Sequence, residues 1–207
     1  MIKPQIILVG AGGHARSCID VIEQNGEFSI FGLVGTHEEV GDEVLGYQVL
    51  GTDNDLGKLK KTCEHALITV GQIKTPKLRK KLFLMLMDLG YSLPTVVSPR
   101  SYVSRNASIG KGTIIMHGAV INAGARVGQN CIINSMSLIE HDAIVSDHCH
   151  ISTGAILNGD GCVGEGSFIG SGSVIREGIN LGQQCIVGMG VVVRQSQPDN
   201  SLILKVH

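Results

Sequence analysis

The second half of the chain carries an aliphatic residue at every sixth position. Counting in steps of six from Val97 to Val193 gives seventeen positions, and each is Val, Ile or Leu. Hydrophobic residues make up 43% of the sequence, so chance would produce such a run with a probability on the order of one in a million. The position four residues later is small at most steps, as at Ala119, Cys131 and Ser173.

This six-residue pattern predicts a left-handed parallel β-helix, in which three short strands form one triangular coil of 18 residues. Aliphatic side chains fill the interior, and small residues or glycine allow the corners to turn. Successive coils lie roughly 4.8 Å apart, so residues separated by 18 positions are stacked neighbours. Cys131, Cys149 and Cys185 should therefore share one inward column as core residues. Flat faces and unpaired strand edges favour self-association.

The composition agrees with a repetitive structure and excludes several partners. The chain has 28 glycines and 3% aromatic residues, fewer rings than an ordinary globular core uses. The net charge is -1, and no Lys/Arg block or long apolar run occurs, so we expect no nucleic acid and no membrane partner. The opening MIKPQIILVGAGGHA has no leader pattern, which predicts a cytoplasmic protein. The six cysteines show no CxxC spacing, so no metal site is expected.

The first half predicts a small α/β domain with a Rossmann-like βαβ unit. The run QIILV at residues 5–9 is typical of a buried strand, and GAGGHA at 10–15 leads from it into a helix through Ile22. Further strands are expected at residues 30–34 and 66–70, and further helices at 56–59 and 75–89. The last helix should expose its basic residues. The predicted domains are 1–94, which binds a nucleotide or sugar substrate, and 95–207, the β-helix.

The glycine-rich turn offers backbone N–H groups and a helix N-terminus to a phosphate. Gly10, Gly12 and Ala15 match the GxGxxA form of a dinucleotide site. The acidic residue expected about 20 positions later is absent, because the second strand ends at Val34-Gly35. NAD is therefore disfavoured. Two interpretations remain: a site for a nucleotide or sugar phosphate, and a turn that only packs helix on strand.

Polar residues interrupt the apolar rhythm most densely between residues 134 and 159, where three histidines lie. We expect His148, like His117 before it, to be a solvated surface side chain. His141 differs, because carboxylates flank it on both sides and could orient its imidazole and raise its basicity. Gly159 follows His141 by 18 residues, so its N–H should lie beside the imidazole, free for a thioester carbonyl oxygen.

Three segments carry a resemblance to a known family over nearly the whole chain: GAGGHA at 10–15, TVVSPRSYVSRNASIG at 95–110, and NSMSLIEHD through HISTGAILNG at 134–159. The chain is similar to the bacterial sugar acetyltransferases of the sialic acid O-acetyltransferase (NeuD) and bacillosamine-precursor N-acetyltransferase (PglD) type. The resemblance implies acetyl transfer from acetyl-CoA to a hydroxyl or amine of sialic acid or a nucleotide-linked amino sugar, in surface glycan biosynthesis. It also implies a homotrimer with active sites between subunits.

The resemblance also implies roles for individual residues. His141 would be the general base in a direct attack without an acyl-enzyme, and Asp142 would orient it. The residues implied for acetyl-CoA are His150, Gly159, Ser171, Gly172 and Gly190, and those for the substrate are Gly12, Gly13, His14 and Asn134.

Two departures from the family bear on its ligands. Relatives that bind uridine usually carry an acidic pair where this chain has Val34-Gly35, so we expect another nucleotide or none. Relatives tend to finish with Gly-x-Pro-Ala-Lys, whereas LKVH stands at residues 204–207, which predicts fewer contacts to the far end of CoA. ISTGAILNG and SFIGSGSVI are closer to the O-acetylating branch and favour sialic acid, but hydroxyl and amine acceptors both stay open.

Two other functions fit parts of the pattern. A non-catalytic trimeric β-helix, serving as a binding or assembly module, would bind no CoA. A nucleotidyltransferase with a β-helical tail needs a larger catalytic domain than residues 1–94 provide, so it ranks last.

Overall fold

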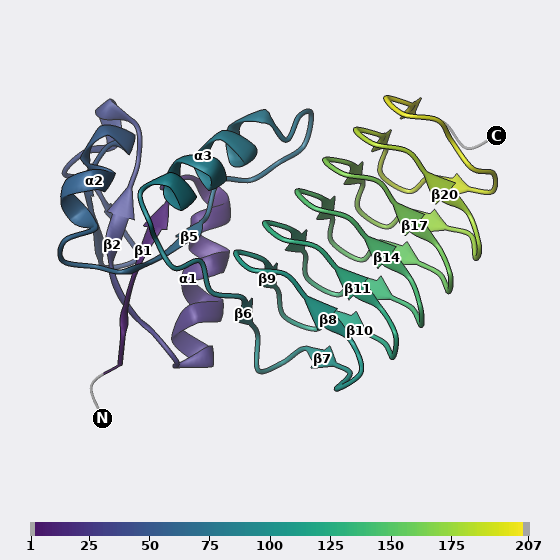
Figure 1. The fold of residues 1–207 in the computed structure, drawn as a ribbon, viewed down its shortest axis with the longest axis horizontal. Coiled ribbons are helices and arrows are strands. Elements are labelled where there is room, and N and C mark those ends of the chain that lie inside the picture. The colour runs from purple at the N-terminus through teal and green to yellow at the C-terminus, as the bar shows by residue number, and fades with distance from the viewer. Residues whose placement is uncertain (1–2, 205–207) are drawn as a thin grey trace.

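The computed structural model describes residues 3–204, which form an α/β unit and a β-helix that lie side by side (Figure 1). The last helix of the α/β unit ends at Asp88, and the first strand of the β-helix begins at Val96. The connecting segment is anchored, because the hydroxyl of Tyr91 donates to the carbonyl oxygen of Leu56 at 2.8 Å. None of the helices in the described range is long and apolar enough to cross a lipid bilayer.

Apolar runs and glycine turns set the elements of the α/β unit. The run QIILV forms a buried inner strand, and the first helix ends where Gly26 takes a left-handed conformation, with φ 72°. The helices are α1 (Gly13–Asn25), α2 (Leu56–Leu59) and α3 (Lys77–Asp88), and the 3-10 turns are η1 (His37–Glu39) and η2 (Asp53–Asp55). The strands are β1 (Gln5–Val9), β2 (Ser29–Val34), β3 (Glu43–Val44), β4 (Tyr47–Gly51) and β5 (His65–Ile68).

These strands form one sheet in the order β3-β4-β2-β1-β5, in which β3 alone among the described strands runs antiparallel to its neighbour. The predicted βαβ unit is confirmed, whereas the β3–β4 hairpin was not predicted. Its turn residues Leu45 and Gly46 both have positive φ, 51° and 87°, as tight hairpin turns require. The carboxyl ends of β1, β2, β4 and β5 meet at one edge, so the loops that follow them can share a ligand.

The second half is the predicted left-handed parallel β-helix. Strands separated by 18 residues pair in parallel register, as Ile132 does with His150 and Leu138 with Ile156. The first face consists of β6 (Val96–Val97), β9 (Ile114–Ile115), β12 (Ile132–Ile133), β15 (His150–Ile151), β18 (Phe168–Ile169), β21 (Ile186–Val187) and β23 (Leu202–Ile203). The second face consists of β7 (Tyr102–Val103), β10 (Val120–Ile121), β13 (Leu138–Ile139), β16 (Ile156–Leu157), β19 (Val174–Ile175) and β22 (Val192–Val193). The third face consists of β8 (Ser108–Ile109), β11 (Arg126–Val127), β14 (Ile144–Val145), β17 (Cys162–Val163) and β20 (Asn180–Leu181).

The core of the β-helix comes from the second residue of each strand and from the small residues between strands. The first residue of each strand points outward, since side chains alternate along a strand. Cys131, Cys149 and Cys185 are all fully buried, as predicted, and the N–H of Cys185 donates to the hydroxyl of Ser167 in the same column. The three thiols are therefore core side chains.

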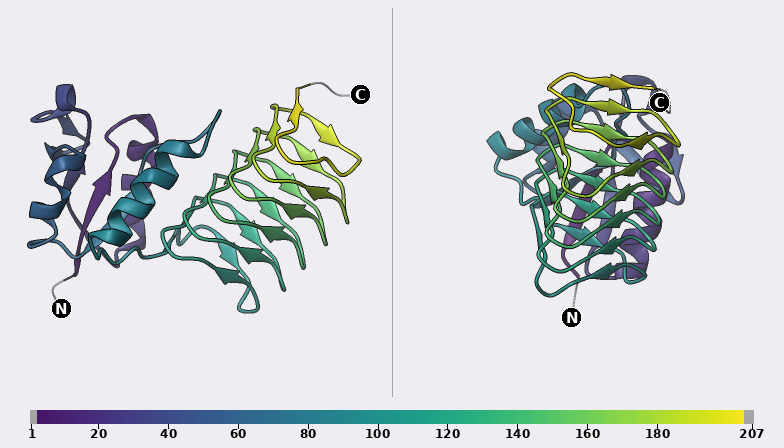
Figure 2. Two further views of the ribbon diagram at one scale, coloured as in Figure 1. Left: turned by 45° about the horizontal axis from the view of Figure 1, so that its top comes forward. Right: turned by 90° about the vertical axis from the view of Figure 1, so that its right-hand side faces the viewer.

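The α/β unit packs against the N-terminal part of the first face (Figure 2). Val96, Ile114 and Ile132 of that face share a buried apolar cluster with Ile19 and Ile22 of α1. This packing fixes the edge of the sheet relative to the coils of the β-helix.

The prediction that α3 exposes its basic residues is wrong for Arg79. Its side chain is buried, and Nη1 donates to the carbonyl oxygens of Ile68 and Val70 at 2.9 and 2.7 Å. Nη2 donates to the side-chain oxygen of Asn130 in the β-helix, also at 2.9 Å. Arg79 thus joins the end of β5 to the β-helix through carbonyl groups that accept from both terminal nitrogens, while its buried Nε atom has no partner among the described residues.

Candidate active site

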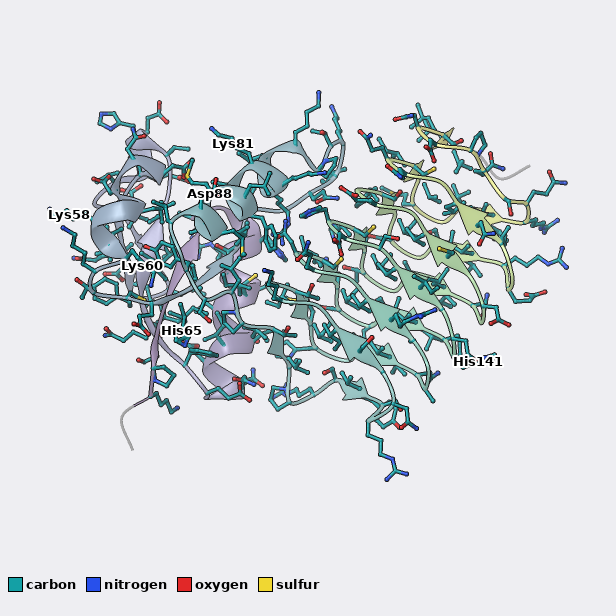
Figure 3. The ribbon with its side chains drawn as sticks, in the orientation of Figure 1. Lys58, Lys60, His65, Lys81, Asp88 and His141 are labelled. Atoms are coloured by element: carbon teal, nitrogen blue, oxygen red, sulfur yellow. The ribbon has the colours of Figure 1, made fainter. Side chains whose placement is uncertain are left out.

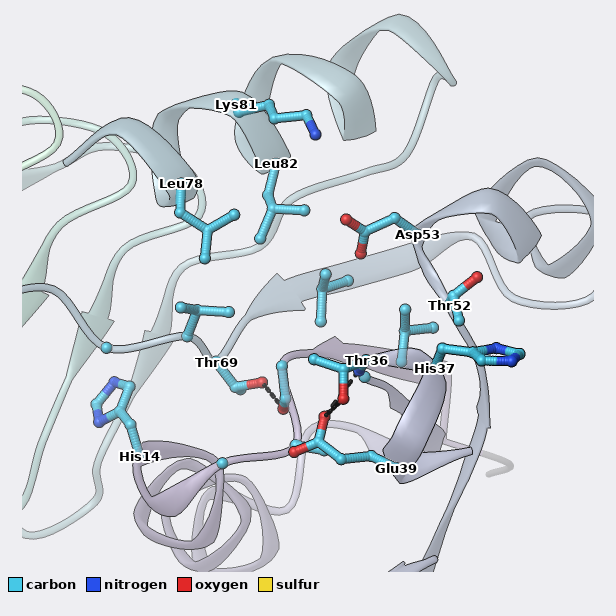
Figure 4. A pocket seen from close by; sticks show the side chains of 18 of the residues that line it. His14, Thr36, His37, Glu39, Thr52, Asp53, Thr69, Leu78, Lys81 and Leu82 are labelled. Carbon is cyan, nitrogen blue, oxygen red and sulfur yellow. Dashed lines mark hydrogen bonds between the residues drawn. The ribbon is translucent and has the colours of Figure 1, made fainter. Parts of the chain in front are cut away.

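A cavity of about 680 Å³ lies over the carboxyl edge of the sheet and is lined by the loops after β1, β2, β4 and β5 (Figure 4). Three of the predicted substrate residues, Gly12, Gly13 and His14, line it. A Cβ at Gly12 or Gly13 would meet nothing within 4 Å, so the turn is open to a ligand. Gly10 has φ 121°, and a Cβ there would lie 2.7 Å from the backbone nitrogen of Val70. Glycine is therefore needed at position 10 for the close packing of the first loop against Val70.

His14 lies at the end of this cavity nearest the β-helix. Its Nε2 atom is buried without a hydrogen-bond partner among residues 3–204. Burial, together with the positive charge of Arg79, lowers the pKa of His14 to about 3. His14 is therefore a neutral imidazole with one unused polar atom, suited to a ligand that enters the cavity.

His141 lies at the corner between the second and third faces, on the side of the β-helix away from the α/β unit (Figure 3). Its Nδ1 atom is 3.0 Å from Oδ2 of Asp142, so Nδ1 carries the proton and donates. This hydrogen bond is the main cause that raises the pKa of His141, with smaller contributions from the charges of Asp160 and Glu140. Nε2 has no partner among the described residues and is free to accept a proton.

Gly159 lies one coil above His141, as the 18-residue spacing predicts. A Cβ at Gly159 would come within 2.6 Å of Nε2 of His141, so only glycine leaves the imidazole its position. The next residue, Asp160, donates its N–H to the carbonyl oxygen of His141 at 3.2 Å. The N–H of Gly159 itself has no acceptor within residues 3–204 and remains available.

A second polar group consists of His150, the first residue of β15 on the first face, and Asn134, at the corner between the first and second faces. Nδ1 of His150 donates to the carbonyl oxygen of Gln72, in the loop after β5, at 2.6 Å. Oδ1 of Asn134 accepts from the N–H of Ser135, which directs Nδ2 of Asn134 at Nε2 of His150 over 3.1 Å. Burial lowers the pKa of His150 to about 4, so it stays neutral and its Nε2 is an acceptor.

The other residues expected to bind acetyl-CoA lie on higher coils of that same corner. Ser171 and Gly172 precede β19, and Gly190 precedes β22. All three are exposed, and the hydroxyl of Ser171 is hydrogen-bonded to that of Ser152 at 2.9 Å. Together with the half-buried Asn134, these residues form a row along this corner of the β-helix, where an extended ligand can lie.

One chain does not bring all the predicted residues together. His141, Asp142 and Gly159 occupy the corner between the second and third faces, whereas Asn134 and His150 lie across the second face. The cavity over the sheet is beside the first face, which is the face opposite the His141 corner. Within one chain, the predicted general base is therefore separated by the second face from the other predicted polar residues.

The expectation that His148 is a solvated side chain is wrong, whereas His117 is partly exposed. His148 is buried, accepts at Nδ1 from Nδ2 of Asn130 at 2.9 Å, and stacks edge-on against Phe83 of α3. His117 lies 2.7 Å through Nε2 from Asp20 of α1. The α/β unit buries His148 and contacts His117, and the periodicity of the β-helix predicts neither contact.

No group of three or more His, Cys, Asp or Glu side chains within the described range is arranged to hold a metal ion. Three of the four residues at 204–207, expected to affect CoA contacts, lie outside the described range.

Three family models match parts of the chain. Residues 5–86 match the PglD N-terminal domain, residues 106–141 match the bacterial transferase hexapeptide (six repeats), and residues 162–195 match the hexapeptide repeat of succinyl-transferase. Among proteins of curated function, none matches the chain.

Solved structures resemble the chain over nearly its whole length. PerB from Caulobacter crescentus, in complex with CoA and GDP-perosamine, is 32% identical, with a TM-score of 0.90, covering 96% of this chain and 92% of PerB. The acetyltransferase domain of PglB from Neisseria gonorrhoeae, in complex with acetyl coenzyme A, is 28% identical, with a TM-score of 0.89, covering 97% and 95%. WeeI from Acinetobacter baumannii shares the fold at 24% identity and a TM-score of 0.85, covering 97% of each chain.

The two-part fold, the three family models and the PerB structure agree with the resemblance found in the sequence. The chain belongs to the family of acetyl-CoA-dependent sugar acetyltransferases in which a PglD-type N-terminal domain precedes a left-handed β-helix.

Proposed function

We propose that the protein transfers the acetyl group of acetyl-CoA to an amine of a nucleotide-linked amino sugar, with His141 as general base. Residues 1–94 would hold the nucleotide, and residues 95–207 would carry the transfer. The observation that carries the proposal is the state of His141: Asp142 holds the proton on Nδ1, and Nε2 is free beside the N–H of Gly159. The ligands of PerB, CoA and GDP-perosamine, support the classes of donor and acceptor.

Negative charge around His141 favours an amine over sialic acid. Asp142, Asp160 and Glu140 all raise the pKa of His141, and Glu177 lines the pocket that His141 and Gly159 share. An amino sugar is partly an ammonium ion at neutral pH, so this field attracts it. Sialic acid carries a carboxylate, which the same field repels. The proposal therefore departs from the sialic acid expected from the repeat segments.

In the proposed reaction the neutral amine attacks the thioester carbonyl carbon while Nε2 of His141 accepts one of its protons. As the C–N bond forms, the carbonyl electron pair moves to oxygen, where the N–H of Gly159 donates to the oxyanion. The C–S bond then breaks, and the CoA thiolate takes the proton from His141. No acyl-enzyme is needed, and Cys149 is fully buried in the core.

The site would be completed by a homotrimer. The outward residues of the second face form an unbroken ladder of apolar side chains: Tyr102, Val120, Leu138, Ile156, Val174 and Val192. This face separates the His141 corner from the Asn134 corner. A cyclic arrangement that covers it with a neighbouring copy can place the His141 corner of one copy beside the Asn134 corner of the next. Light scattering after size-exclusion chromatography should give three times 21.9 kDa.

A free-thiol assay for CoA release tests the reaction. The acceptor panel contains GDP-linked and UDP-linked 4-amino sugars, CMP-sialic acid and free sialic acid. We expect acetyl-CoA-dependent thiol release with an amino sugar and none with either sialic acid. Thiol release with sialic acid alone would contradict the proposed amine acceptor and show that the acceptor is a hydroxyl group. A chain that binds no CoA in a thermal-shift titration would instead be an assembly module.

A further inference from the structure

The cavity over the carboxyl edge of the sheet, which the proposed function assigns to the nucleotide, is called the nucleotide cavity below. Two of its charged side chains are not used by the acetyl-transfer site. Asp53, on the η2 turn after β4, points into the cavity, and Lys81 of α3 lies across from it (Figure 4). Among residues 3–204, neither side chain has a hydrogen bond or an ion pair. The cavity thus presents an unused carboxylate on one wall and an unused ammonium group on the other.

Neighbouring carboxylates at this end of the cavity are already engaged. Oε2 of Glu39 accepts from the N–H and the hydroxyl of Thr36, at 2.7 and 3.0 Å. In the same way Oδ2 of Asp55 accepts from the N–H and the hydroxyl of Thr52, at 2.8 and 3.1 Å. These contacts stabilise the η1 and η2 turns and leave Asp53 free to meet a ligand.

The arrangement of the sheet fixes which part of a nucleotide sugar would meet Asp53. The sugar must reach the β-helix, so it lies at the β5 end of the cavity, where His14 and Gly71 are. The diphosphate belongs at the glycine turn after β1, at the start of α1. The strand order β4-β2-β1-β5 then leaves the base over the ends of β2 and β4, beside Asp53.

Guanine is the base whose edges match this pair of charges. It offers two adjacent donors, N1–H and the N2 amino group, to a carboxylate, and two adjacent acceptors, O6 and N7, to a lysine. Uracil offers one N–H between two carbonyl oxygens, and adenine offers one amino group beside ring nitrogens that repel a carboxylate. The apolar side chains of Leu82 and Met85 line the same cavity and can cover the face of a ring.

We infer that Asp53 and Lys81 recognise the base of the bound nucleotide sugar and that this base is guanine. The inference rests on the proposed function, since it takes the cavity to hold a nucleotide. Asp53 would accept from N1–H and N2–H, and Lys81 would donate to O6 and N7. A bidentate contact of this kind discriminates between bases by about 5- to 150-fold in affinity.

Isothermal titration calorimetry of the full chain with GDP, IDP, UDP and ADP tests the inference without acetyl transfer. IDP lacks the N2 amino group of GDP and is otherwise the same. We expect GDP to bind most tightly, IDP more weakly, and UDP and ADP more weakly still. Asp53→Asn should weaken GDP binding by about 5- to 150-fold and leave UDP binding nearly unchanged. Lys81→Met should also weaken GDP and IDP binding more than UDP binding.

Asp88→Asn is the matched control. Asp88 is exposed at the end of α3, and its carboxylate does not line the cavity. The affinities of this variant should equal those of the unchanged protein. Equal weakening of all four nucleotides by Asp53→Asn would assign Asp53 to the ribose and overturn the inference. Binding of UDP in preference to GDP would overturn it while leaving the proposed nucleotide-sugar function intact. If none of the nucleotides binds, the proposed function of the cavity fails as well.

Discussion

The imidazole of His150 donates from Nδ1 to the main-chain carbonyl oxygen of Gln72 over 2.6 Å. His150 belongs to the β-helix, whereas Gln72 belongs to the loop that follows β5 at the carboxyl edge of the sheet. The bond fixes the tautomer of His150, so that Nε2 accepts from Asn134. Asn134 therefore has its second amide proton free, and the loop of the α/β unit directs a polar group of the β-helix.

The neutral state of His150 predicts that it does not shape the pH dependence of the reaction. Its pKa of about 4 lies below the working range, since burial disfavours the cation. We expect His150→Asn to lower kcat, because the orientation of Asn134 is lost. The acid limb of kcat/KM should keep its midpoint. A shift of that midpoint in His150→Asn would show that His150 takes part in proton transfer.

The acid limb should instead report His141. A base acts when unprotonated, and the hydrogen bond to Asp142 raises the pKa of His141 above 6.5, so activity should rise with pH through a midpoint above 6.5. His141→Ala should lower kcat by about 10² to 10⁴. Asp142→Asn should move the midpoint of kcat/KM to lower pH. An unchanged midpoint in Asp142→Asn would show that Asp142 does not raise the pKa of the general base.

Replacing Gly159 should disturb catalysis more than stability. The new Cβ of Gly159→Ala would lie 2.6 Å from Nε2 of His141, so the exposed imidazole must move. A displacement of about 1 Å at a reacting group costs about 10²-fold in rate, and we expect kcat to fall by that amount. The thermal midpoint should change little. Gly57→Ala, on exposed helix α2, is the control and should keep full activity.

The buried histidines should make the fold less stable in acid. The pKa values of His14 and His150 are lowered to about 3 and about 4, against 6.5 when unfolded. Between pH 6.5 and 4 the unfolded chain therefore binds more protons, and stability falls as the pH falls. The slope is about 1.4 kcal/mol per pH unit for each histidine. Urea unfolding at pH 7.5 and 5 measures it, and His14→Gln should reduce the slope. An identical slope in that variant would contradict the burial of a neutral His14.

Much of the fold could be predicted because one physical rule governs the β-helix. Each aliphatic position from Val97 to Val193 that the six-residue count selects ends a strand of the structure. The stacking of Gly159 on His141 followed from the same spacing. Local spacing was sufficient there, because each coil contacts the coils directly above and below it.

Features that depend on packing between the two parts could not be predicted. His148 and Arg79 looked like surface residues, and both are buried where α3 meets the β-helix. The β3–β4 hairpin was missed because its turn uses Leu45 at positive φ, where Asn or Asp would have been the usual signal. Asp53 was not predicted as a site residue, because its position opposite Lys81 depends on the order of the strands in the sheet.

The most direct test of the account is to mix two inactive subunits. Chains with His141→Ala and chains with Asn134→Ala are coexpressed under different tags, and the doubly tagged trimers are isolated. If each site combines the His141 corner of one copy with the Asn134 corner of the next, every doubly tagged trimer has one interface with both intact residues, which is about a third of its interfaces. We therefore predict that acetyl-CoA-dependent acetylation of an amino sugar recovers to about that fraction of the unmodified trimer. Mixed trimers with no more activity than either variant alone would contradict a site shared between copies.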